Sequence, residues 1–156
     1  MTYVTEVQNE DNNRAADAAR AAAEEARAYA DNAVTYLSEG ENAYRNRQYE
    51  QSLKLYQKAL NNQPDVDRAI VYNNMALSYL KLNKFQNVVL YSEKSIQANP
   101  QSSGQSLAAS YYNMGLANEK LKKYKDAAQN FQKAANAHSN NTVYLNALKR
   151  VRKQIK

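Results

Sequence analysis

The 156-residue sequence contains no cysteine, no tryptophan, one histidine, two prolines and three glycines. Without cysteine there is no disulfide bond, no thiolate metal site and no cysteine nucleophile. So little glycine and proline argues against a β-sandwich and against an α/β enzyme with glycine-rich turns. With one histidine, only an all-oxygen metal site could be assembled. The composition therefore favours one all-α domain, and we expect neither a metal nor a cofactor.

Residues that could carry catalysis are also scarce. The one histidine, His138, lies near the end of a predicted helix, where a structural role is the ordinary one. The carboxylates are scattered and form no acid/base pair. The glycines stand alone at positions 40, 104 and 115, so no phosphate-binding loop is present. We expect that the protein is not an enzyme and has no catalytic residues.

Long hydrophobic runs are missing as well. No apolar stretch approaches the roughly 18 residues that a membrane-spanning helix needs. The first twenty residues lack the apolar core of a secretory signal. These absences favour the cytoplasm, although they leave the compartment open.

Charge is divided unevenly along the chain. Residues 1–40 hold eight acidic residues and three arginines, for a net charge of −5, whereas residues 41–156 carry a net charge of +11. Solvated helix faces alone would account for this division. The alternatives are that the basic part attracts an acidic partner, or that the acidic part screens it.

Three segments of the sequence align with one another: 36–64, 72–100 and 111–139. Each begins with a tyrosine, has a small residue four positions later and an aromatic residue thirteen positions later. The equivalent residues are Tyr36, Gly40, Tyr49, Tyr56, Ala59 and Pro64; Tyr72, Ala76, Phe85, Ser92, Ser95 and Pro100; and Tyr111, Gly115, Tyr124, Phe131, Ala134 and Ser139. Self-similarity of this length predicts a repeat protein.

The spacing of these residues resembles the tetratricopeptide repeat over about residues 36–139. The resemblance implies three units of two antiparallel helices each, stacked into an α-solenoid because one unit cannot bury its own apolar face. We therefore predict a three-repeat domain at 33–139, with helices at about 33–46, 49–61, 67–82, 85–98, 104–121 and 124–137. Small residues would allow close helix contact, and the aromatic residues would fill the space between helices.

Residues 140–156 predict a basic amphipathic helix that caps the solenoid. Tyr144, Leu148, Val151 and Ile155 follow helical spacing and form one apolar stripe. The remaining positions include Lys149, Arg150, Arg152, Lys153 and Lys156. A terminal repeat needs such a cap with a polar outer face. A patch that binds nucleic acid or anionic lipid is the alternative.

Residues 1–32 form an acidic, alanine-rich arm, and we expect residues 1–10 to be disordered and the rest helical. A heptad seam passes through Ala16, Ala19, Ala23, Ala26, Ala30, Ala33, Leu37 and Gly40. Its register predicts one continuous helix from about residue 12 to 46. The arm could be a solvated extension, could pack against the repeats, or could self-associate through the alanine seam.

The resemblance also implies a binding site, because the first helices of such repeats line a concave face that grips peptides or helices of partner proteins. Carried over by position, the groove residues are Leu37, Glu41, Tyr44 and Arg45 in the first unit; Asn73, Asn74, Leu77, Leu80 and Lys81 in the second; and Tyr112, Asn113, Leu116, Glu119 and Lys120 in the third. Asn74 and Asn113 occupy equivalent positions, and each amide can donate and accept a hydrogen bond. They would bind a peptide backbone or, alternatively, only water.

One branch of the family binds the acidic C-termini of heat-shock chaperones through two asparagines and two basic residues. Asn74 fits one asparagine position, but Glu41 stands at the other, and Ala109 and Asn113 stand at the basic positions. Charge-assisted hydrogen bonds are about twice as strong as neutral ones, so we expect this specificity to be absent.

The sequence thus predicts a protein–protein interaction module that binds a partner peptide or helix in its concave groove. A structural subunit that self-associates through the N-terminal helix is the first alternative. A basic surface for acidic partners, nucleic acid or anionic membrane is the second. Nucleic acid and membrane are the less favoured partners, because no face interleaves aromatic and basic residues as single-strand binding requires.

Overall fold

The computed structural model describes the backbone of residues 2–62, 66–101 and 104–156, and the side chains of these residues except 2–7, 30 and 32–34. The described residues form seven α-helices and no strand. The helices are α1 (Thr2–Arg45), α2 (Tyr49–Asn62), α3 (Arg68–Lys81), α4 (Phe85–Ala98), α5 (Gln105–Lys120), α6 (Tyr124–Ala137) and α7 (Thr142–Arg152). The predicted all-α fold is confirmed. The last helix is shorter than predicted: α7 ends at Arg152, and Ile155 lies beyond it.

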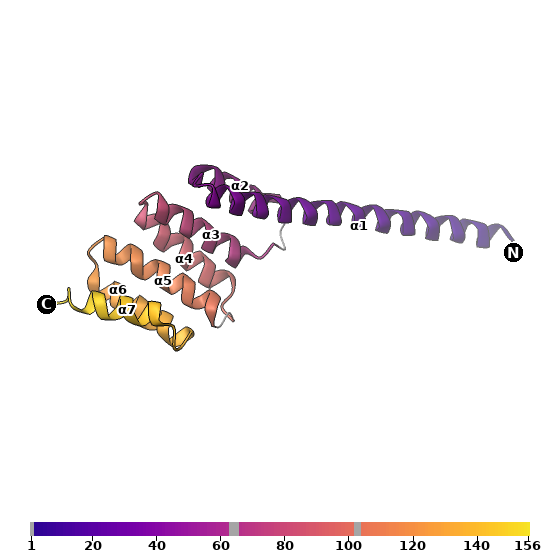
Figure 1. The fold of residues 1–156 in the computed structure, drawn as a ribbon. Helices are drawn as coiled ribbons and strands as arrows, with labels where there is room; N and C mark the ends of the chain where they lie inside the picture. The colour runs from indigo at the N-terminus through magenta and orange to yellow at the C-terminus, as the bar shows by residue number, and fades with distance from the viewer. Residues whose placement is uncertain (1, 63–65, 102–103) are drawn as a thin grey trace.

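The helices stack in chain order, and the two chain ends lie at opposite ends of the molecule (Figure 1). The C-terminal part of α1 packs on α2, α3 packs on α4, and α5 packs on α6, which gives three helix pairs. Neighbouring pairs are joined by contacts of α2 with α3 and of α4 with α5, and α7 packs on α6. This arrangement is the helical solenoid that the repeat pattern predicts.

Each helix pair turns on one residue in the left-handed backbone conformation. These residues are Arg47 (φ 62°), Asn83 (φ 57°) and Lys122 (φ 60°), which occupy equivalent positions in the three units. After each of them, the next N–H reaches back into the first helix, as in the 2.9 Å bond from Gln48 N to Ala43 O. This is a Schellman-type helix end, which satisfies carbonyls that the helix leaves unpaired.

Two glycines let an aromatic ring lie directly against a helix backbone. A Cβ on Gly40 would lie 2.5 Å from Cε1 of Tyr56, and one on Gly115 would lie 2.5 Å from Cδ1 of Phe131. Both rings are fully buried, with exposed fractions of 1% and 0%. The small residue of the repeat is therefore required by close packing inside the pair.

The core lies between the helices along the whole stack. One cluster joins α2 to α3 through Tyr56, Leu60, Val71 and Met75. Another joins α6 to α7 through Phe131, Leu148 and Val151. Because α7 buries Tyr144, Ala147, Leu148 and Val151, it covers the apolar face that α6 would otherwise expose.

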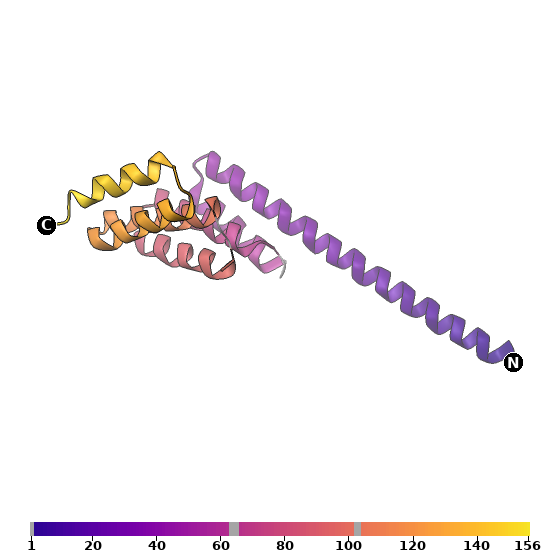
Figure 2. The same cartoon turned by 90° about the horizontal axis from the view of Figure 1, so that it is seen from below.

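The N-terminal arm is one helix with the first unit, since α1 passes through residue 32 without a break. Figures 1 and 2 both show its N-terminal part extending away from the stack, and residues 8–29 are exposed. The expected disorder of residues 1–10 is wrong for residues 2–10, which are helical; Met1 lies outside the described residues. No glycine or proline interrupts these residues, so the helix nucleated in the alanine-rich part extends through them.

Two members of the alanine seam, Ala30 and Ala33, have side chains outside the described set. The described seam residues of the arm, from Ala16 to Ala26, are exposed. None of the described helices combines the length and the apolar character that crossing a membrane would take.

Candidate peptide-binding groove

The first helices of the three units lie next to one another, with α3 in contact with both α1 and α5. Five of the predicted groove residues from α1 and α3 line one pocket of about 310 Å³. They are Glu41, Tyr44, Arg45, Asn74 and Leu77. Tyr56 of α2 completes the wall, because Gly40 leaves its ring room to reach α1. We call this pocket the first-unit pocket.

Glu41 organises the polar side of the first-unit pocket. The Nδ2 of Asn74 donates to its Oε1 at 3.4 Å, and Nη2 of Arg45 lies 3.7 Å from its Oε2. Both contacts are long, and the Glu41 side chain keeps 40% of its surface exposed. A carboxylate has about four acceptor positions, so Glu41 retains the capacity to accept hydrogen bonds from a ligand.

Tyrosine rings and Leu77 form the apolar side of the pocket. The Tyr44 ring meets Tyr49 edge-on, with centroids 5.5 Å apart. Burial raises the pKa of Tyr44, and it raises the pKa of Tyr56 to about 12, with the negative charge of Glu41 as a further cause. Both hydroxyls are therefore neutral at physiological pH.

A second pocket, of about 560 Å³, lies at the third-unit end of the groove. Leu116, Glu119 and Lys120 of α5 line it together with Lys122, Tyr124, Arg150 and Gln154. Arg150 of α7 donates to both carboxylate oxygens of Glu119, at 2.9 and 2.6 Å. This two-point contact, which raises the pKa of Arg150, closes the groove against the capping helix.

Other predicted groove residues are directed into the protein. Asn113 is only 3% exposed, and its Nδ2 donates to Oδ1 of Asn73 at 3.1 Å. The expectation that Asn113 faces a ligand is therefore wrong: its amide joins α5 to α3 instead. Leu37 and Leu80 are partly buried against the core clusters, so they contribute mainly to packing.

Tyr112 is likewise partly buried, because its ring packs between two aromatic rings. Its centroid lies 5.6 Å from that of Phe131 and 5.1 Å from that of Tyr144 on α7. Lys81, the last residue of α3, is exposed. The structure thus brings the α1 and α3 residues together in the first-unit pocket, and Leu116 and Lys120 in the second.

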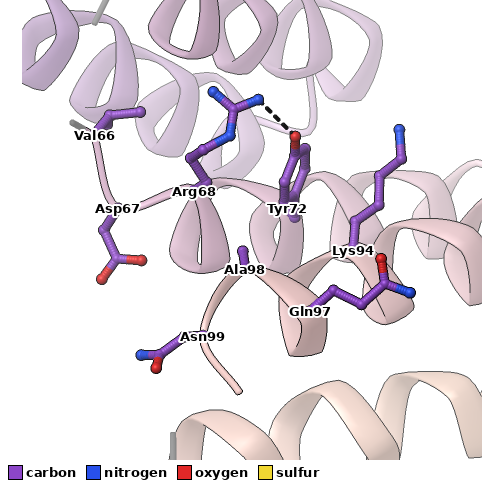
Figure 3. A pocket seen from close by; sticks show the side chains of 8 residues that line it. All are labelled: Val66, Asp67, Arg68, Tyr72, Lys94, Gln97, Ala98 and Asn99. Atoms are coloured by element: carbon purple, nitrogen blue, oxygen red, sulfur yellow. Dashed lines mark hydrogen bonds between the residues drawn. The ribbon is translucent and has the colours of Figure 1, made fainter. Parts of the chain in front are cut away.

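A larger hollow of about 640 Å³ lies between the start of α3 and the end of α4, away from the groove residues (Figure 3). Arg68 donates to the hydroxyl of Tyr72 at 2.8 Å, and its guanidinium carbon lies 5.5 Å from the ring centroid. Lys94 lies 4.9 Å from the Tyr91 centroid. Both cations thus interact with protein rings, and cation–π contacts of this kind stabilise by about 0.5–1 kcal/mol at exposed sites.

The groove offers donors, acceptors and apolar surface for binding. Among the residues that the structure describes, no three histidine or acidic side chains converge to hold a metal ion. His138, half-buried at the end of α6, packs edge-on against the Tyr144 ring at 6.3 Å between centroids.

Five residues that line the two pockets lie outside the predicted groove: Tyr56, Lys122, Tyr124, Arg150 and Gln154. Tyr56 was assigned to packing alone, although the glycine four residues after Tyr36 indicated that its ring approaches α1 closely. Arg150 was assigned to the outer face of the cap. Its pairing with Glu119 depends on where α7 lies in space, which no pattern in the sequence specifies.

Comparison with known proteins agrees with this architecture. The family model described as tetratricopeptide repeat matches residues 69–102 and 108–141, which contain most of the second and third predicted units. The TPR domain of Arabidopsis OM64 superposes with a TM-score of 0.73 at 26% identity, covering 81% of this chain and 99% of that one. No curated protein sequence matches the chain.

Two further solved structures share the fold. The N-terminal domain of stress-induced protein-1 from C. elegans is 24% identical with a TM-score of 0.69, covering 83% of this chain and 98% of that one. The second TPR domain of human RPAP3, solved in complex with the HSP70 peptide SGPTIEEVD, is 18% identical with a TM-score of 0.69. That match covers 80% of this chain and 98% of the RPAP3 domain.

Proposed function

We propose that this chain, whose residues 69–102 and 108–141 match the tetratricopeptide-repeat model, binds a peptide or helix of another protein along its concave face. The repeat is a non-catalytic protein-interaction fold, in line with the expectation that the chain is not an enzyme. The observation that carries the proposal is the convergence of five groove residues from α1 and α3 in the first-unit pocket.

The chemistry of the first-unit pocket defines the ligand that it suits. Leu77 and the Tyr44 ring accept an apolar side chain, since both are partly exposed beside the cavity. Glu41 accepts a donor, which a backbone N–H, an amide or a basic side chain of the ligand can supply. With three units the contact is small, so we expect a transient complex that buries less than about 1,200 Å².

The HSP70 peptide bound by the RPAP3 domain supports a protein partner for this chain, but we do not extend that peptide's identity to it. Glu41 places a negative charge in the first-unit pocket, where an acidic peptide end would be repelled. Asn113 is also buried and bonded to Asn73, so it does not replace a basic residue of the chaperone-binding branch.

The proposal is tested by selecting peptides from a random twelve-residue library on the full chain and measuring their affinity for two variants. Leu77→Glu places a charge in the apolar side of the pocket, and we expect it to weaken binding at least tenfold. Gln129→Glu, on the exposed face of α6, adds the same charge away from the groove and should leave affinity unchanged. Equal affinity of both variants would place the binding site elsewhere, provided that circular dichroism shows both folded.

A second candidate function is assembly through the N-terminal arm. The observation that favours it is the exposure of residues 8–29, which extend from the stack as a helix with no partner surface among the described residues. The arm of a second copy of the chain, packed along the alanine seam, would cover this exposed helix. Alanine side chains bury little area, so this association would depend on close approach of the two helices.

A further inference from the structure

A strongly basic hollow adjoins the third-unit end of the groove. It has a volume of about 430 Å³ and is lined by the turn between α5 and α6 and by the C-terminal residues after α7. It shares Lys122, Tyr124 and Gln154 with the pocket at the third-unit end, so the two cavities are neighbours. We call it the lysine hollow, after Lys122, Lys123, Lys125 and Lys156, which line it.

Positive charge predominates in the lining of the lysine hollow. All four lysines are exposed, and Asp126 is the one acidic residue of the lining. In the described part of the chain, the ion pairs within 4.0 Å all involve arginine and none involves these lysines. Glu119, the nearest acid of the adjoining pocket, already receives two hydrogen bonds from Arg150.

The two ends of the groove therefore differ in charge. Glu41 and Arg45 give the first-unit pocket one charge of each sign, whereas Lys120 and the lysine hollow make the other end basic. The floor of the hollow is partly apolar, since Tyr124 and Ile155 are half-buried there. A bound chain would thus donate hydrogen bonds to Glu41 at one end of the groove and place carboxylates near the lysines at the other end.

We propose that the lysine hollow binds an acidic segment of the partner protein, a short run of aspartate and glutamate adjacent to the part that occupies the groove. Lysine ammonium groups are compact point charges with three donors each, so separate lysines can each bind a separate carboxylate without a forked geometry. The volume of about 430 Å³ suits a few side chains, whereas a nucleic-acid interface is a much larger surface. This inference rests on the proposed function for the partner's orientation, but the hollow's preference for carboxylates can be measured by itself.

The test uses fluorescein-labelled octaglutamate and the full chain, with affinity measured by fluorescence anisotropy. We expect salt-sensitive binding that is lost with octaglutamine, because the interaction is between charges. The double variant Lys122→Gln/Lys125→Gln should bind octaglutamate about fivefold more weakly, since each exposed charge pair contributes modestly. Both lysines are exposed, so the fold should be unaffected.

The matched control is Lys54→Gln/Lys149→Gln, which removes two exposed lysines that do not line the hollow. Equal weakening by both double variants would overturn the proposal, because it would show attraction by overall charge. Tighter binding of octauridylate or of phosphatidylserine vesicles than of octaglutamate would overturn it as well. Preserved octaglutamate binding in Leu77→Glu would support the hollow even if the groove proposal fails.

Reversing the charge of the same two lysines tests the assignment of the site more stringently. Lys122→Glu/Lys125→Glu should prefer octalysine over octaglutamate, while the control Lys54→Glu/Lys149→Glu should retain the original preference. An unchanged preference in the first variant would contradict the assignment of the site to the lysine hollow.

Discussion

Serine hydroxyls occupy buried positions between the helices of this solenoid. The Oγ atoms of Ser52 and Ser78 are 2.7 Å apart, and Ser95 donates to Ala69 O at 2.8 Å while accepting from Ser110 at 3.1 Å. Each of these four hydroxyls is satisfied, so small polar residues can stand where the helices approach closely. Ser92 differs, because its buried Oγ has no hydrogen-bond partner among the described residues.

The two serines of α4 should respond oppositely to removal of the hydroxyl. Ser92→Ala should raise the free energy of unfolding by up to about 1 kcal/mol, because it removes an unsatisfied buried polar group. Ser95→Ala should lower it by about 1–2 kcal/mol, because it deprives Ser110 of an acceptor and removes the bond to Ala69. Urea denaturation of both variants checks this, and a larger loss for Ser92→Ala than for Ser95→Ala would contradict the hydrogen-bond assignment.

The sequence predicted some groove residues correctly and misplaced others for a physical reason. Glu41, Tyr44, Arg45, Asn74 and Leu77 came together because the repeat register determines which face of a helix they share. The same register cannot distinguish a residue that faces the groove from one that reaches the neighbouring helix. Asn113 belongs to the second kind, since its amide donates a hydrogen bond to Asn73, which lies 40 residues earlier in the sequence.

Helix boundaries were the most predictable feature at the scale of the element. From α2 to α6 they differ from expectation by at most one residue, because each turn repeats the same left-handed helix end. The arm was less predictable. Their terminal position favoured disorder at residues 1–10, whereas α1 continues to Thr2 from the alanine-rich part, where extending a nucleated helix costs less than starting one.

The arm should be energetically independent of the stack. Deleting residues 2–31 should leave the thermal unfolding midpoint within about 2 °C of the full chain, because residues 8–29 are exposed and lend no side chain to the core. Differential scanning calorimetry measures this directly. A fall of several degrees would show that the arm packs on the repeats.

The same deletion separates the two candidate functions when mass in solution is measured by analytical ultracentrifugation. Assembly through the arm predicts an oligomeric full chain and a monomeric truncated chain. If both are monomeric at high protein concentration, the arm does not mediate self-association.

At the scale of the whole molecule, stacking creates properties that no single repeat has. The first-unit pocket holds one charge of each sign, Glu41 and Arg45, whereas the end beside α7 is basic, so the proposed partner would bind in a preferred direction. The repeat pattern predicted the solenoid and its concave face, since equivalent residues recur in three units. It could not predict that Arg150 would pair with Glu119 and close the groove, because that contact joins residues of the cap and the third unit.

The central claim is that the concave face holds the partner's peptide or helix. The most direct measurement is a map of amide chemical-shift changes when the isotopically labelled full chain binds a selected peptide. The account predicts changes in the last two turns of α1 and along α3 and α5, around Glu41, Asn74 and Leu77. Changes confined to the outer helices α2, α4 and α6, with those three residues undisturbed, would contradict it.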